Sequence, residues 1–290
     1  QTICQNKQYI YQKKQGWCFY YILEFITGKY IDYGVICVDR MTIAAQLYTL
    51  RDFTRTPEDI EDTLKKVKKI GFNAVQVSGI GPIEPERLKG ICDDLGLAIC
   101  ATHTPYERLK NDTEAVIREH KLWNCKYVGL GAMPKEFERS KEGFLAFAKE
   151  CNEIAKRIYE SGLKFAYHNH NFEFEKLDGI TGMEILINET DPQAFGFIID
   201  TYWVQAGGAN PVDWIRKVEG RMGVVHLKDM AVIKGQQAFA EIGEGNLDWP
   251  SIIKACRENG VEWYAVEQDI CLRDPFESLK ISLEYLMKFV

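Results

Sequence analysis

The 290-residue sequence lacks several features that would assign it to a class of protein at once. It has no low-complexity tract and no repeat of solenoid length, so a repeat architecture is not expected. No apolar run approaches the ~20 residues of a membrane span. Positive charge is not in excess, because 36 Lys and Arg stand against 42 Asp and Glu, for a net charge of -6. Nucleic-acid binding depends mainly on clustered Lys and Arg, so a small neutral or weakly anionic substrate fits better than a nucleic acid.

Paired cysteines are also missing. The nine cysteines are odd in number and contain no CxxC pair. This usage is typical of buried thiols in a reducing compartment rather than of a disulfide framework or a zinc knuckle. We therefore predict a cytoplasmic protein, with export as the alternative that the first 40 residues leave open.

Residues 1–40 do not follow the pattern of the rest of the chain. Their aromatic residues cluster without a period of 2.0 or 3.6, and a regular pattern begins only at Met41. The stretch from Trp17 to Ile26 resembles the apolar part of a signal peptide, but it contains a glutamate and no small-residue cleavage site follows it. We interpret residues 1–40 as an extension of uncertain structure: a poorly ordered segment, a targeting remnant or upstream translated sequence.

From Met41 onward, strand-like apolar runs alternate with amphipathic helical patterns eight times. Proline at positions 57, 85 and 211 marks the first turn of three of the helices. The expected strands are 43–48, 74–78, 98–102, 127–130, 164–168, 195–200, 223–226 and 263–267, and the expected helices are 57–71, 85–95, 113–123, 141–161, 182–188, 211–218, 247–259 and 275–289.

Eight such units over residues 41–290 match the ~250 residues typical of a closed parallel barrel. We therefore predict a single-domain α/β fold, a (β/α)8 TIM barrel. A doubly wound open sheet is less favoured, because Q-L-Y-T-L-R at 46–51 stands where a glycine-rich dinucleotide fingerprint would follow the first strand.

Ligand-type side chains gather at the carboxyl ends of the expected strands, which form the active face of a parallel barrel. Four of the five histidines lie there, while His120 falls in a helix; the full set is His103, His168, His170, Asp200, His226 and Glu267. Such nitrogen and oxygen donors suit one divalent ion, whether Mn²⁺, Co²⁺, Fe²⁺, Zn²⁺ or Mg²⁺.

Two of these residues also have an ordinary structural interpretation. Asp200 fits the N-cap of the helix that follows it, and His226 fits a core histidine with one hydrogen bond. Glu267 is harder to explain in this way, because a glutamate at the end of a buried strand needs a charged partner or a metal ion.

Five stretches carry a family resemblance: Y-H-N-H at 167–170, D-T-Y-W at 200–203, H-L-K-D at 226–229, G-E-G-N-L-D-W at 243–249 and V-E-Q-D at 266–269. In order and spacing, residues 41–290 resemble the xylose isomerase-like TIM barrel superfamily of sugar phosphate isomerases and epimerases. The resemblance implies one divalent metal ion, held by a residue that ends the fifth strand together with Asp200, His226 and Glu267.

The fifth strand departs from the commonest pattern of that superfamily. Ketose epimerases typically have Glu-Asn where this chain has His168-Asn169. His168 is the positional candidate for the metal ligand, and Glu173 and His170 are the alternatives. In the epimerases two metal-bound glutamates act on opposite faces of the substrate, so a two-base epimerisation would require Glu173 beside Glu267. If His168 is the ligand, a single-base isomerase or a lyase is favoured.

The resemblance implies a metal-dependent sugar isomerase or epimerase that removes a proton next to a carbonyl and forms an enediolate, with Glu267 and Glu173 as catalytic residues. A keto-sugar or inosose-type dehydratase is the alternative, because loss of a β-oxygen can follow the same first step. Residues expected to contact substrate are His103, His170, Trp203, Lys228, Asp229 and Glu244.

Ordinary alternatives exist for three of these residues. Lys228 and Asp229 would also fit a solvated pair, and Glu244 a tight turn between glycines. An abasic-site endonuclease is less favoured, because its trinuclear zinc site needs more histidines, and so is a non-catalytic sugar-binding barrel. The expected partner is a small sugar or sugar derivative, with no nucleic acid and no membrane, and a homo-oligomer is left open.

Overall fold

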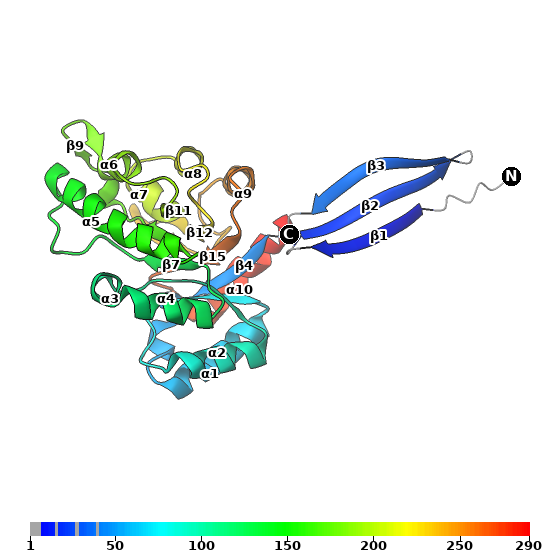
Figure 1. Cartoon of the computed structure of the whole chain (residues 1–290), viewed down its shortest axis with the longest axis horizontal. Coiled ribbons are helices and arrows are strands. Elements are labelled where there is room, and N and C mark those ends of the chain that lie inside the picture. Colours follow the sequence, from blue (N-terminus) through cyan, green and yellow to red (C-terminus); the bar gives the residue numbers. More distant parts are fainter. Residues whose placement is uncertain (1–6, 15–16, 27–28, 39–40) are drawn as a thin grey trace. The chain divides into compact units, whose positions relative to one another are not determined.

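The computed structural model describes residues 7–14, 17–26, 29–38 and 41–290, and the chain divides into two compact units, Gln1–Met41 and Thr42–Val290 (Figure 1). The first unit is a three-stranded antiparallel sheet in the order β1-β2-β3. Its strands are β1 Lys7–Lys14, β2 Trp17–Ile26 and β3 Lys29–Val38. The sequence patterns assign no element to this segment.

The second unit is a closed barrel of parallel strands, and it confirms the predicted (β/α)8 fold. The strands follow one another around the barrel in chain order, and the last pairs with the first through Trp263 and Thr42. They are β4 Thr42–Gln46, β5 Ala74–Val77, β6 Ala98–Thr102, β7 Tyr127–Leu130, β8 Lys164–His168, β11 Phe195–Asp200, β12 Val224–Leu227 and β15 Trp263–Val266.

Helices cover the outside of the barrel (Figure 1). Those that follow the barrel strands are α1 Pro57–Ile70, α2 Pro85–Leu95, α4 Thr113–Leu122, α5 Lys141–Glu160, α6 Gly182–Glu189, α8 Pro211–Lys217, α9 Trp249–Glu258 and α10 Pro275–Leu286. The start of α1 shows why they form where they do. Pro57 occupies the first turn, and Thr56 and Asp59 each accept a hydrogen bond from the other's backbone N–H, which satisfies the free donors of the helix end.

The barrel also contains shorter helices and two short hairpins. They are η1 Leu47–Phe53, α3 Tyr106–Asn111, η2 Phe172–Phe174, α7 Thr201–Ala206 and η3 Met287–Phe289, with the short hairpins β9 Lys176–Leu177 with β10 Ile180–Thr181 and β13 Asp229–Ile233 with β14 Gln236–Ala240. Several of them follow the carboxyl ends of barrel strands, the end at which the ligand-type side chains lie.

The side chains inside the barrel change from apolar to polar along its axis. One cluster of buried residues is mainly small or aliphatic; it includes Tyr127, and the half-buried Trp263 packs against it. Gly223 makes room for the Tyr127 ring, because a Cβ at that position would lie 1.9 Å from the Tyr127 hydroxyl oxygen. Towards the carboxyl ends the buried side chains become polar: Gln46, Gln76, Thr102, His168, Asp200, His226 and Glu267. The fold therefore places a buried polar layer on the face expected to hold the active site.

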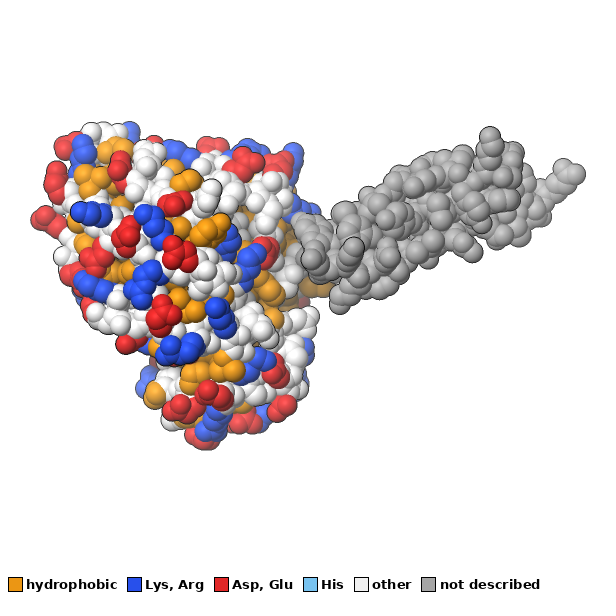
Figure 2. Space-filling view, viewed as in Figure 1, with side chains coloured by type: hydrophobic (Ala, Val, Ile, Leu, Met, Phe, Trp, Pro, Cys, Tyr) orange, Lys and Arg blue, Asp and Glu red, His pale blue; other side chains and the backbone are white. Residues whose placement is uncertain are grey.

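The barrel surface mixes both signs of charge. On the face shown in Figure 2, positive and negative side chains are interspersed, so this face offers no continuous basic surface to a phosphate backbone. The described cysteines, at positions 92, 100, 125, 151, 256 and 271, are free thiols, and all but Cys271 are buried. Among the residues that the structure describes, no helix is both long and apolar enough to cross a bilayer.

Candidate active site

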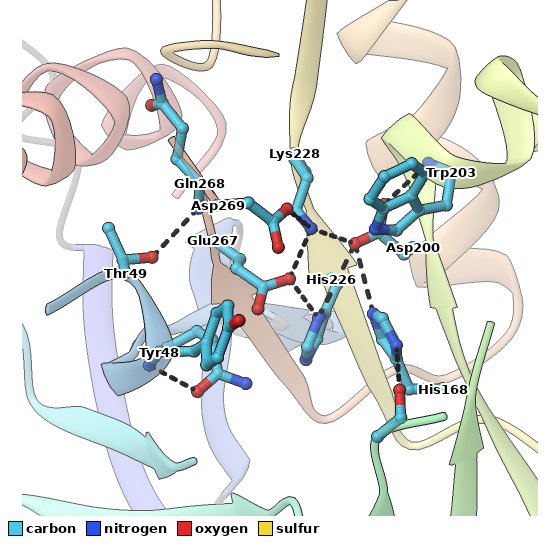
Figure 3. Close-up of polar contacts among 12 residues, drawn as sticks. Tyr48, Thr49, His168, Asp200, Trp203, His226, Lys228, Glu267, Gln268 and Asp269 are labelled. Carbon is cyan, nitrogen blue, oxygen red and sulfur yellow. Dashed lines mark hydrogen bonds and ion pairs between the residues drawn. The ribbon is translucent and has the colours of Figure 1, made fainter. Parts of the chain in front are cut away.

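Four side chains from neighbouring strands converge at the carboxyl end of the barrel (Figure 3). Ligand atoms of His168, Asp200, His226 and Glu267 all lie within 4.8 Å of one another, and all four residues are buried. The sheet register explains part of this convergence, because Asp200 and His226 are direct partners across β11 and β12. A buried cluster of two imidazoles and two carboxylates could bind a metal ion.

The distances within this metal-ligand cluster identify the atoms that face one another. Asp200 Oδ2 lies 3.3 Å from His168 Nε2 and 3.9 Å from His226 Nδ1. Glu267 Oε2 lies 3.0 Å from His226 Nδ1. Each strand thus contributes one donor atom to a common point.

The outer nitrogen of each imidazole is held by an oxygen. His168 Nδ1 lies 3.0 Å from the Gly131 carbonyl oxygen, and His226 Nε2 lies 2.7 Å from Gln76 Oε1. Because these oxygens only accept hydrogen bonds, the ring protons belong on those nitrogens. When the rings are neutral, His168 Nε2 and His226 Nδ1 therefore turn lone pairs towards two carboxylates. Such an arrangement requires a proton or a metal ion between the groups, so the residues fit a metal site.

The pKa of His168 also indicates that this site favours a positive charge. Burial alone would lower its pKa, but the hydrogen bond and negative charge of Asp200 outweigh burial and raise the pKa of His168 above its ordinary value. A positive charge at Nε2 is thus favoured.

Lys228 is buried beside the cluster and contacts three carboxylates (Figure 3). Its Nζ lies 3.0 Å from Asp200 Oδ2, 2.7 Å from Glu267 Oε2 and 2.6 Å from Asp269 Oδ2. Burial opposes the charged form, but the carboxylates prevail and raise the pKa of Lys228. Burial would raise the pKa of Glu267, but Lys228 and His226 outweigh this effect and hold the pKa of that carboxyl well below its ordinary value.

The charges around Lys228 do not balance without a further cation. Three carboxylates and one ammonium leave two negative charges in a largely buried cluster when the imidazoles are neutral. Uncompensated charge is costly in such a place. One divalent ion would bring the formal charge of this group to zero.

The cluster lies at one side of a cavity of about 510 Å³. His103, His168, His170, Glu267 and Asp269 line it, together with the loops that follow β5, β6 and β7. A second cavity of about 520 Å³ shares His103 and residues 78–79 with the first. Either volume lies in the range of a small-molecule site.

Three of the residues predicted to contact substrate have a buried polar atom without a protein partner in the described part of the chain. These atoms are His103 Nε2, His170 Nδ1 and Trp203 Nε1. The His170 and Trp203 rings are neighbours, with centroids 5.3 Å apart. Burial lowers the pKa of His170 to about 3, so its ring is neutral and can accept or donate a hydrogen bond. Buried polar atoms are normally paired, so these three are suited to a bound polar molecule.

Glu173 lies outside the metal-ligand cluster. The Tyr167 hydroxyl donates to its Oε1 at 2.5 Å, and the His170 backbone N–H donates to its Oε2 at 2.9 Å. Burial raises the pKa of Glu173 to about 7. The structure thus uses Glu173 to brace the loop after β8, and of the three candidates for the fifth strand it brings His168 to the other ligands.

Asp229 is fully buried and faces the 243–249 loop. Its carboxylate accepts hydrogen bonds from the backbone N–H groups of residues 230, 243, 245 and 247 and from the Trp249 indole. This geometry favours a loop-supporting role over the predicted substrate contact. Glu244 also has a partner within the protein. It lies at the surface, where its carboxylate pairs with the Arg273 guanidinium at 2.9 Å.

Three residues that support the site had no predicted role. Asp269 pairs with Lys228, Gln76 holds His226, and Asn169 Oδ1 accepts the Asp200 backbone N–H at 3.0 Å. Two of them left a signal in the sequence. Gln76 is a polar residue inside the otherwise apolar strand A-V-Q-V, and Asp269 belongs to the V-E-Q-D stretch.

The chain is similar in sequence to several curated proteins. An inosose dehydratase from Clostridium botulinum (strain Alaska E43 / Type E3) is 27% identical over 169 residues, which is 53% of this chain and 54% of that protein. An inosose dehydratase from Clostridium perfringens (strain 13 / Type A) is 24% identical over 259 residues, 75% of this chain and 85% of that protein. The chain spans about half the length of the first of these relatives.

Solved structures show the same fold. A sugar phosphate isomerase/epimerase from Parabacteroides distasonis ATCC 8503 superposes with a TM-score of 0.71 at 24% identity, covering 85% of this chain and 97% of that one. The family model described as xylose isomerase-like TIM barrel matches residues 64–288. This match covers most of the chain and confirms the resemblance seen in the sequence: the chain belongs to the xylose isomerase-like TIM barrel family.

Proposed function

We propose that this protein is a divalent-metal-dependent sugar isomerase that removes a proton next to a carbonyl and passes through an enediolate of the substrate. The observation that carries the proposal is the convergence of two imidazole lone pairs and two carboxylates at a cavity with unpaired polar atoms. The inosose dehydratase and sugar isomerase names among the similar proteins support a sugar-like substrate.

His168 Nε2, Asp200 Oδ2, His226 Nδ1 and Glu267 Oε2 would hold the ion. When bound, a divalent ion polarises a substrate carbonyl and acidifies the adjacent C–H bond. Two nitrogen and two oxygen donors suit Mn²⁺, Fe²⁺, Co²⁺ or Zn²⁺, and Mg²⁺ less well.

Glu267 is the residue proposed to take the proton. Its ion pairs within the described residues use Oε2, which leaves Oε1 unengaged, and the side chain lines the cavity. Its lowered pKa keeps it in the ionised form that a base requires. The Lys228 ammonium, 2.7 Å from Oε2, is close enough to stabilise negative charge that develops on the substrate oxygens.

Substrate hydroxyls would be oriented by the unpaired atoms of His103, His170 and Trp203. The indole and imidazole rings also offer apolar faces to the C–H side of a sugar. Asp229 would act indirectly, by fixing the loop at 243–249.

The position of Glu173 bears on the choice between isomerisation and epimerisation. Both of its oxygens are hydrogen-bonded within the protein, so of the two glutamates predicted to be catalytic we assign the role of base to Glu267. One base suits an isomerisation, in which it returns the proton to the neighbouring carbon, better than a two-base epimerisation.

Elimination is the second candidate, and the names of the curated relatives favour it. In that reaction the C–H proton goes to Glu267, the C–O bond β to the carbonyl breaks, and the hydroxyl leaves as water once it is protonated. Both candidates share the first step at Glu267.

The test is proton exchange measured by NMR. Protein stripped with a chelator and reconstituted with Mn²⁺, Co²⁺ or Zn²⁺ would be incubated with a panel of keto-sugars and inososes in deuterated water. An isomerase incorporates deuterium at one carbon of a new sugar, whereas a dehydratase gives an unsaturated product and water. Activity that is undiminished by exhaustive chelation would refute the proposal.

Two glutamate variants make a matched pair for this experiment. Glu267→Gln is expected to abolish exchange while the far-UV circular dichroism stays that of the wild type. Glu173→Gln, at another buried glutamate near the same face, is expected to retain exchange. Loss of exchange in both variants would point to a two-carboxylate reaction.

A further inference from the structure

We propose that Lys228 is a built-in second cation that weakens divalent metal binding and keeps the ion exchangeable, and that Asp269 controls how much of the lysine charge acts on the metal ligands. This inference rests on the proposed metal site. It concerns the affinity of that site rather than its reaction.

The lysine shares its oxygen partners with the metal-ligand cluster. Nζ lies 3.0 Å from Asp200 Oδ2 and 2.7 Å from Glu267 Oε2. The same two oxygens face the inward nitrogens of His168 and His226. A cation held by these oxygens therefore competes with the ammonium for their negative charge, and the two positive charges repel each other in a site shielded from water.

The lysine is fixed in this position. Lys228 is fully buried, and its Nζ lies over the Trp203 ring at 5.4 Å and the Phe239 ring at 5.7 Å from their centroids. Its backbone is held too, because Thr201 Oγ1 accepts its N–H at 3.0 Å and donates to its carbonyl at 2.8 Å. The packing therefore offers the ammonium no nearby position in solvent, and it stays beside the ligands.

Asp269 draws the ammonium away from the two ligands. Its Oδ2 makes the shortest of the three contacts to Nζ, at 2.6 Å, and its side chain remains 24% exposed. The Arg51 guanidinium donates to the Asp269 carbonyl oxygen at 2.8 Å, which ties this loop to the neighbouring one. Asp269 is thus a counter-ion for the lysine that does not belong to the metal-ligand cluster.

The charge balance predicts opposite effects for the two residues. With Lys228 and Asp269 both present, a divalent ion brings the formal charge of the group to zero. Removal of the lysine charge leaves one extra negative charge on the ligands, and removal of the aspartate charge leaves one extra positive charge. Metal affinity should therefore rise in the first case and fall in the second.

The experiment measures Co²⁺ and Zn²⁺ affinity of the full chain by competition with a chromophoric chelator, after all metal has been stripped. Lys228→Met is expected to bind each ion at least about tenfold more tightly than wild type, because it removes a positive charge next to the ligands. Asp269→Asn is expected to bind each ion about tenfold more weakly, because it leaves the lysine charge without its counter-ion. Lys254→Met, at an exposed lysine of α9 on the outside of the barrel, serves as the matched control and should leave both affinities unchanged.

A double variant shows whether Asp269 acts through the lysine. In a Lys228→Met background, Asp269→Asn should change the affinity by less than about threefold, because the residue it neutralises is gone. An undiminished effect of Asp269→Asn in that background would overturn the role given to Asp269.

The remaining outcomes separate this inference from the proposed function. Equal or weaker metal binding by Lys228→Met, with wild-type circular dichroism, would show that the lysine supports the ligands and would overturn the inference. If Lys228→Met does not fold, unchanged binding by Asp269→Asn would overturn it. Wild-type protein that binds neither ion would refute the metal site itself.

Discussion

Glu173→Gln should change how stability depends on pH, and the size of the change follows from the structure. The Glu173 side chain is fully buried, and burial raises its pKa from 4.5 to about 7. Between these values the unfolded chain loses a proton that the folded chain keeps, so the contribution of Glu173 to stability falls as pH rises. At about 1.4 kcal/mol per unit, the loss between pH 4.5 and pH 7 is about 3 kcal/mol.

The assay is urea unfolding of metal-free wild type and variant at half-unit steps from pH 4.5 to 8, followed by circular dichroism. Groups that titrate equally in both proteins cancel in the difference between their free energies of unfolding. We expect wild type to lose about 3 kcal/mol relative to Glu173→Gln over this range, with the loss complete above pH 7.

A flat difference would refute the reasoning. It would mean that Glu173 ionises normally in the folded protein and that its carboxylate is stabilised by charges not seen around it. Glu173 would then again be a candidate for a second catalytic carboxylate beside Glu267.

Three further predictions concern other parts of the barrel. Burial lowers the pKa of His120 to about 4, so stability should fall by up to about 3 kcal/mol as pH drops from 6.5 to 4, and urea unfolding of His120→Gln should lack this slope. Asp229→Ala leaves several loop N–H groups without their acceptor, so it should lower the free energy of unfolding by at least about 3 kcal/mol and allow new proteolytic cleavage at 243–249. Asp229→Asn keeps one acceptor oxygen and should lose less stability. His168→Glu exchanges a nitrogen ligand for oxygen, so the metal bound after equilibration with equal Zn²⁺ and Mn²⁺ should shift towards Mn²⁺, and an unchanged ratio would argue against His168 as a ligand.

The fold was predictable because most strands are short apolar runs with clear ends. The strands at 98–102, 127–130, 164–168 and 195–200 have the boundaries expected from the sequence. The first strand is shorter than expected, because the chain turns into η1 at Leu47, where Gln46 Oε1 accepts the Tyr48 N–H. An apolar run of this length does not distinguish a strand from a short helix. The six-residue helices α3 and α7 were not predicted, because they are too short to show a helical period.

The candidate site was predictable in its residue types but less so in its contacts. The helix-cap and ligand interpretations of Asp200 proved compatible, because Oδ1 accepts the Trp203 N–H at 2.9 Å while Oδ2 faces the imidazoles. The sequence left open the choice among His168, His170 and Glu173. That choice depends on how the loop after β8 folds and on which group accepts the hydrogen bond of the Tyr167 hydroxyl. The pairing of Lys228 with Asp269 depends on two loops that are 41 positions apart in the chain.

The proposed metal ligands and much of the cavity wall come from different halves of the chain, and this division affects which substitutions the site can accept. The proposed metal ligands come from β8, β11, β12 and β15, which are consecutive around the barrel, whereas much of the cavity wall comes from loops between residues 48 and 135. Substitutions in the first half of the chain can therefore reshape the space offered to a substrate without touching the ligands. Gln76 and Gly131 are exceptions, because the side-chain oxygen of Gln76 holds His226 and the backbone carbonyl oxygen of Gly131 holds His168 from the other half. Libraries that diversify substrate preference should vary the first-half loops and leave Gln76 and Gly131 unchanged.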